Sequence, residues 1–107
     1  MFGLADLERI ADLELTNQEQ RVFWTIARAL TKDSGSIARI ATSEIAERTG
    51  IHKSNVASTL ASLRRRNIIT RERVGVWVVN PWIMYAGSAE DWETATAEAP
   101  EPEWSRS

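Results

Sequence analysis

The stretch that decides the fold is TSEIAERTGIHKSNVASTLASLRRR, residues 42–66. Its first half predicts a short helix that Thr42 or Ser43 caps, because a hydroxyl at a helix start accepts a hydrogen bond from an early amide. Gly50 ends that helix. The second half predicts a longer helix whose apolar residues share one face, and these are Val56, Leu60 and Leu63. Two short helices joined by a glycine turn are the layout of a helix-turn-helix.

Outside this apolar face, the second helix is polar and basic. The outward residues include Lys53, Ser54, Asn55, Ser58 and Arg65. A polar, cationic face over a thin apolar seam suits a DNA groove.

The flanking segments predict the rest of a winged helix. A capping box starts a helix over residues 17–32, and residues 37–41 predict a single edge strand. Residues 68–71 and 76–79 are rich in β-branched side chains, and their connection over 72–75 contains a glycine, so they predict a β-hairpin. The fold class is therefore mainly α with a small β-sheet, in the order helix, strand, helix, helix, hairpin wing.

Three regions follow from this division of the chain. Residues 1–15 predict an extra amphipathic helix, and residues 16–87 the winged helix-turn-helix domain. Within that domain, Trp82–Tyr85 is a dense apolar stretch expected to form a turn or an irregular cover. Residues 88–107 are acidic and poor in aliphatic side chains, a composition that predicts a disordered tail.

Charge is distributed unevenly, although the chain of 107 residues carries a net charge of only −2. Residues 1–14 hold four acids against one base, residues 15–87 hold eleven bases against five acids, and residues 88–107 hold six acids against one base. The domain is therefore locally basic, and a low total charge does not count against nucleic-acid binding.

Composition excludes several classes of protein. The chain has no cysteine and one histidine, so it can form neither disulfides nor a thiolate or histidine-rich metal site. No apolar run is long enough to cross a membrane, and the acidic start is unlike a signal peptide, which favours a cytoplasmic protein. There is no glycine-rich phosphate loop and no nucleophile-base pair, so we expect no enzyme and no cofactor.

Two pieces of the chain carry a resemblance to known families. The block TSEIAERTGIHKSNVASTLASLRRRNIITRERVGVWVVNP resembles the winged-helix domains of bacterial transcription regulators such as the MarR class. The segment VWVVNPWIMYAGSAEDW is similar to RepL-type plasmid replication proteins and related actinobacterial plasmid and phage proteins. Together the resemblance covers about residues 16–92.

The resemblance implies sequence-dependent binding to double-stranded DNA, with the second helix in the major groove. The DNA-binding residues it implies are Thr42, Ser43, His52, Lys53, Ser54, Asn55, Ser58, Arg64, Arg65, Arg66, Arg71 and Arg73. Asn55 suits adenine and Lys53 suits guanine or phosphate, while Arg71 and Arg73 are expected to point the same way from the wing.

Simpler interpretations stand beside these roles. The three arginines at 64–66 also suit a solvated helix end that interacts with the last carbonyls, and His52 suits a helix cap.

The expected role is that of a plasmid, phage or bacterial regulator, or of a replication or partition factor. The alternative is a winged helix that binds protein and not DNA. We expect a homodimer, because paired half-sites add specificity that one short helix lacks. Its interface, or one with another protein, is expected at residues 1–15 or at Trp82–Tyr85, with the opposite possibility that the N-terminal segment packs on its own core.

Overall fold

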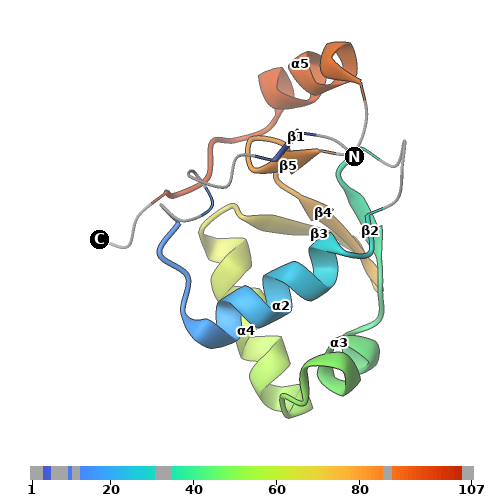
Figure 1. The fold of residues 1–107 in the computed structure, drawn as a ribbon, viewed down its shortest axis with the longest axis vertical. Coiled ribbons are helices and arrows are strands. Elements are labelled where there is room, and N and C mark those ends of the chain that lie inside the picture. The colour runs from blue at the N-terminus through green and yellow to red at the C-terminus, as the bar shows by residue number, and fades with distance from the viewer. Residues whose placement is uncertain (1–3, 6–9, 11–12, 31–34, 86–87, 105–107) are drawn as a thin grey trace.

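The structure is a computed structural model and describes residues 4–5, 10, 13–30, 35–85 and 88–104. In chain order its elements are β1 (Leu4–Ala5), α2 (Asn17–Ala27), β2 (Ile37–Arg39), α3 (Thr42–Thr49), α4 (Lys53–Arg65), β3 (Ile69–Arg73), β4 (Val76–Val79), β5 (Met84–Tyr85) and α5 (Ala89–Glu98). Helices α2, α3 and α4 pack together beside a small antiparallel sheet (Figure 1). From α2 to β4 the order of elements is the one predicted for a winged helix-turn-helix.

A capping box starts α2, as predicted. The Thr16 hydroxyl accepts a hydrogen bond from the Glu19 amide at 3.1 Å, and the Glu19 carboxylate accepts one from the Thr16 amide at 2.9 Å. The helix ends at Ala27, earlier than the predicted residue 32, and Leu30 instead forms a β-bridge with Ala38. The bridge ties the chain that leaves α2 to the edge strand.

The start of α3 differs from the prediction. Ala41 is its N-cap residue and makes no side-chain capping bond, so Thr42 and Ser43 already belong to the first turn. Only the residue before the first turn has the extended backbone that lets its side chain reach back to the free amides. The end of α3 is as predicted, because Gly50 takes the left-handed conformation, with φ of 72°, that favours glycine.

His52 caps α4. Its backbone is extended, and its ring nitrogen Nδ1 accepts a hydrogen bond from the Ser54 amide at 3.2 Å. The apolar seam predicted for this helix is buried against the other helices, and it consists of Val56, Leu60 and Leu63. The helix therefore rests on the core along one side and leaves its other side in solvent.

The wing is the hairpin of β3 and β4, with Val74 and Gly75 between them. β4 is the central strand and pairs antiparallel with both β3 and β2, so β2 is an edge strand as predicted. The wing is anchored in the core by Ile69, Trp77 and Val79, and the Trp77 indole donates a hydrogen bond to the Ile40 carbonyl at 3.1 Å. This packing gives a two-stranded hairpin the support that it lacks alone.

The N-terminal segment differs from the predicted helix. Leu4–Ala5 is a strand that pairs with β5, while residues 1–3, 6–9 and 11–12 lie outside the described part of the chain. Ile10 and Leu13 are buried in the core. The segment thus packs on its own chain where it is described, which was the alternative to a dimer contact.

The apolar stretch after the wing is a covered part of the fold. Pro81 begins a turn, and Ile83, Met84 and Tyr85 are buried, the last two in β5. The stretch is thus the cover that the sequence predicted, and of the residues proposed for an interface at Trp82–Tyr85 only Trp82 is partly exposed.

The prediction of disorder after residue 88 is wrong for the described residues 88–104, which contain α5. The Ser88 hydroxyl caps this helix by accepting from the Asp91 amide at 3.1 Å. Trp92 donates to the Pro81 carbonyl at 2.8 Å and packs edge-on against Trp82, with ring centroids 6.4 Å apart. The composition of the tail predicted disorder because it does not reveal that the tail packs on apolar residues elsewhere in the chain.

Candidate nucleic-acid interface

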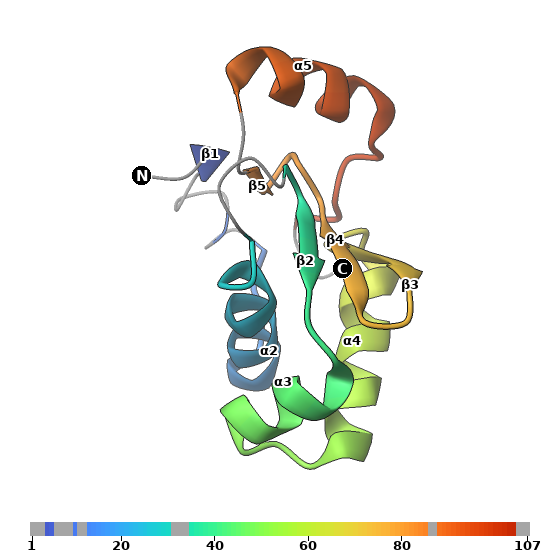
Figure 2. The ribbon, with the colours of Figure 1, turned by 90° about the vertical axis from the view of Figure 1, so that its right-hand side faces the viewer.

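The N-terminal end of α4 is an open polar surface. His52, Lys53, Ser54, Asn55 and Ser58 are all exposed, as the sequence predicted for the part of the helix that reads DNA. Figure 2 shows α4 and the hairpin of β3 and β4 on the same side of the molecule, with α2 on the other side. One flank therefore presents both predicted DNA-binding elements.

Three of these side chains, those of His52, Ser54 and Ser58, already make hydrogen bonds at the start of the helix. The Ser54 hydroxyl lies 2.8 Å from His52 Nδ1, and the Ser58 hydroxyl donates to the Asn55 carbonyl at 3.1 Å. By contrast, the side chains of Lys53 and Asn55 have no hydrogen bond or ion pair in the described part of the chain. Lys53 and Asn55 are therefore the two groups freest to bind a ligand.

Helix α2 holds α4 in place through hydrogen bonds from residues that the sequence analysis did not single out. Gln18 donates to the Thr59 hydroxyl at 2.8 Å, and Ser62 donates to the carboxylate of the buried Glu19 at 2.9 Å. Because Glu19 also belongs to the capping box, one carboxylate fixes both the start of α2 and the middle of α4. The capping-box spacing was the only signal in the sequence for this contact.

The three consecutive arginines at the end of α4 have different surroundings. Arg64 and Arg65 are exposed beside a shallow cleft of about 390 Å³ between α4 and β3. Arg66 is only 7% exposed, and its Nη2 donates to the carbonyls of Leu13 at 2.5 Å and Glu103 at 2.9 Å. Arg66 is thus a structural residue, and its prediction as a DNA contact does not fit this position.

Arg71 and Arg73 are both exposed on the wing, but the predicted common orientation is wrong. Arg71 pairs with Trp77 and Arg73 pairs with Val76, with a β-bulge between the two arginines. Neighbouring residues of β4 point to opposite faces, so the two arginines lie on opposite faces of the hairpin. The Arg71 guanidinium lies 6.0 Å from the centroid of the Trp77 ring, which leaves Arg73 as the outer cation of the wing.

Thr42 and Ser43 complete the predicted set. Thr42 is half-buried and Ser43 is exposed in the first turn of α3. Ser43 can therefore offer a hydroxyl at the surface, as phosphate contacts require.

The described residues bring no three histidine, aspartate or glutamate side chains together as a metal site, and none of the described helices is long and apolar enough to cross a bilayer.

The fold, together with the exposed polar face of α4, defines a winged helix-turn-helix protein. A family model described as Firmicute plasmid replication protein (RepL) matches residues 5–98. This match covers most of the chain, so the protein belongs to the RepL family and has a role connected with plasmid replication. Comparisons with curated proteins and with solved structures found no match.

Proposed function

We propose that this protein binds double-stranded DNA in a sequence-dependent way as part of plasmid replication. The observation that carries the proposal is the N-terminal end of α4, where Lys53 and Asn55 extend from the surface without partners among the described residues. The protein acts by binding, without catalysis and without a cofactor.

The dimensions of α4 suit the major groove. An α-helix with its side chains is about 10–12 Å across, and the major groove of B-DNA is about 12 Å wide. Asn55 can bond both N6 and N7 of adenine, while Lys53 reaches guanine or a phosphate. Base contacts then come from two residues, and the sequence preference depends mainly on Asn55.

Phosphate contacts supply the remaining affinity. Arg64 and Arg65 at the far end of α4 and Arg73 on the wing are exposed cations, and α4 and the wing lie on the same side of the molecule in Figure 2. Each phosphate that a cation neutralises releases counterions from DNA, so binding weakens as salt increases. Two copies on a palindromic or repeated site would double the number of contacts, and we propose a homodimer on DNA.

The experiment is fluorescence anisotropy with a duplex from the plasmid replication origin and with a random duplex, at several salt concentrations. Asn55→Ala should reduce the preference for the origin duplex roughly tenfold, because a bidentate base contact contributes about 1–3 kcal/mol. Arg73→Ala should weaken binding to both duplexes and reduce the salt slope by about one. Arg28→Ala, which removes a charge from α2 on the opposite side, is the matched control and should leave both affinities unchanged.

Equal affinity of the unmodified protein for both duplexes would contradict sequence-dependent binding. No binding to either duplex at low salt would contradict DNA binding altogether and favour the protein-binding alternative. Stoichiometry measured on the origin duplex tests the homodimer, which requires two chains per site.

A further inference from the structure

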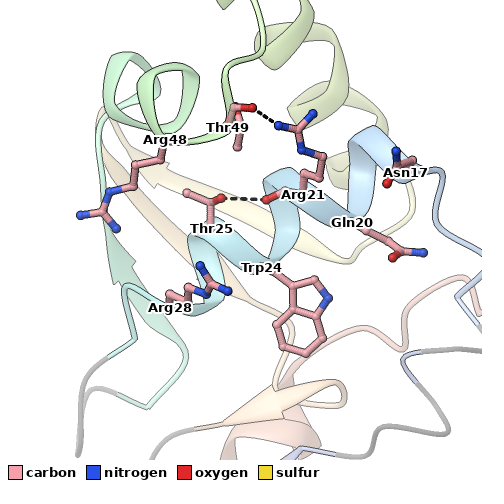
Figure 3. A pocket seen from close by; sticks show the side chains of 8 residues that line it. All are labelled: Asn17, Gln20, Arg21, Trp24, Thr25, Arg28, Arg48 and Thr49. Carbon is pink, nitrogen blue, oxygen red and sulfur yellow. Dashed lines mark hydrogen bonds between the residues drawn. The ribbon is translucent and has the colours of Figure 1, made fainter.

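A second cationic site lies on the side of α2 that faces away from the wing. Helices α2 and α3 form the floor of an open surface cavity of about 310 Å³, and the lining includes Arg21, Arg28 and Arg48 together with Trp24 (Figure 3). No acidic residue lines it. A volume of this size lies at the lower end of the range for small-molecule sites.

The arginines are positioned but not neutralised. Arg21 donates to the Thr49 carbonyl at the end of α3, which orients its guanidinium. Arg48 pairs with Glu44 at 2.5 Å, but both side chains are about half exposed, and such a surface pair is weak. Arg28 has no ion pair or hydrogen bond from its side chain in the described part of the chain. The lining of the cavity therefore carries three guanidinium groups, which Figure 3 shows pointing in different directions.

Trp24 adds an aromatic surface to this charge. It is half-buried, and among the tryptophans of the described residues its indole N–H alone donates no hydrogen bond. Trp77, Trp82 and Trp92 donate to backbone carbonyls, and Trp104 donates to Glu101. The Trp24 indole N–H is therefore available at the cavity to donate a hydrogen bond to a ligand.

We propose that this cavity binds one nucleotide unit, either of a single DNA strand or of a free nucleotide. The phosphate lies against the arginines and the base lies against the indole of Trp24. Side-chain amides of Asn17 and Gln20, which also line the cavity, offer donors and acceptors to the edge of a base. Cationic grooves combined with aromatic side chains are how proteins hold single strands without sequence preference.

This site is separate from the proposed duplex site. α2 and the wing lie on opposite sides of the molecule in Figure 2, and the residues that line the cavity do not include Lys53, Asn55 or the cations of the wing. A protein with both sites can hold duplex DNA on one side and a separated strand on the other, and replication requires both forms of DNA.

The test follows the five indole N–H signals by NMR while a short oligothymidylate or thymidine monophosphate is added, with Trp24→Phe used to assign the Trp24 signal. We expect the Trp24 signal to shift with oligothymidylate. A shift with thymidine monophosphate as well would identify a site for a free nucleotide, and a shift with the oligonucleotide alone would identify a strand site. No shift with either ligand would overturn the proposal.

Anisotropy with labelled oligothymidylate then measures the role of charge. The double variant Arg28→Ala, Arg48→Ala should bind roughly tenfold more weakly at moderate salt, since two phosphate contacts are lost. Arg39→Ala is the matched control, because Arg39 is an exposed arginine of β2 that does not line the cavity, and its affinity should change less than about twofold. Equal losses in both variants would overturn the proposal.

Duplex binding is measured with the same proteins. The double variant should bind oligothymidylate more weakly but keep the duplex affinity of the unmodified protein. A wrong cavity proposal would appear in the oligothymidylate data, and a wrong duplex proposal would appear as no duplex binding by the unmodified protein.

Discussion

The two ends of α4 carry similar residues but have opposite surroundings. At its start, Lys53 and Asn55 extend into solvent from a turn that only His52 caps. Immediately after its end, Arg66 is enclosed by the N-terminal and C-terminal segments through Leu13 and Glu103. The first end is open to a ligand, while the second is bonded to one segment near Leu13 and another near Glu103.

This comparison shows that a charged residue in a basic run has no fixed role. Arg65 and Arg66 are neighbours in sequence, yet one is exposed and the other is almost fully buried. A helix turns by about 100° per residue, so adjacent side chains face different surroundings. Distant segments then decide which arginine becomes structural.

Loss of Arg66 should have the largest effect. Arg66→Ala removes two charge-assisted hydrogen bonds and leaves the carbonyls of Leu13 and Glu103 without this donor, so we expect the free energy of unfolding to fall by about 3 kcal/mol. Urea denaturation measures this change. Arg66→Met should restore part of the loss, because Nε and Nη1 are buried without partners and the methionine keeps the apolar packing. Equal stability of the alanine variant and the unmodified protein would show that the two ends of α4 do not differ as described.

Asn80, which follows β4, provides a second test of the end of α4 that contacts the C-terminal segment. Its amide donates to the carbonyls of Asn67 at 2.6 Å and Pro100 at 2.8 Å, and its oxygen accepts from the Trp82 amide at 3.0 Å. Asn80→Ala should lower the free energy of unfolding by about 2 kcal/mol, since three backbone groups lose a partner. Asn80→Asp is the control that keeps only the acceptor, and thermal unfolding of both variants compares the donor bonds with the acceptor bond.

Arg65 provides the converse test. Because Arg65 is exposed, Arg65→Ala should change the free energy of unfolding by less than about 0.5 kcal/mol. Its duplex affinity should fall a few-fold, about 1 kcal/mol, with a salt slope reduced by about one. A variant that unfolds more easily but binds DNA normally would assign Arg65 to the closed end.

His52 gives the smallest expected effect, at the open end. His52→Ala removes the cap of α4 and should cost about 0.5 kcal/mol, whereas His52→Asn should restore it because asparagine is a good capping residue. Circular dichroism during thermal unfolding measures both variants. A loss that asparagine does not restore would mean that His52 acts through something other than the cap.

Local rules predicted the winged helix well. The capping box at Thr16, the glycine end of α3 and the apolar seam of α4 all depend on residues close in sequence, and the structure confirms each of them. The same helical spacing predicted that the polar residues at the start of α4 would be exposed.

Contacts between distant segments were the part that the sequence could not predict. Burial of Arg66 depends on Glu103, and order in α5 depends on Trp82 and Pro81. The bulge that separates Arg71 from Arg73 arises from the pairing with β4 and has no local signal. The cavity beside Trp24 was missed because its arginines come from two different helices.

The pairing of β1 with β5 has a consequence for how the chain folds as it is made. Leu4 lies opposite Tyr85, so this strand pair cannot form until nearly the whole domain has left the ribosome. The helices and the wing use closer contacts and can form first, whereas closure of the long loop between β1 and β5 comes late and slowly. During synthesis, Leu4–Ala5 should therefore remain unpaired until Met84–Tyr85 emerge.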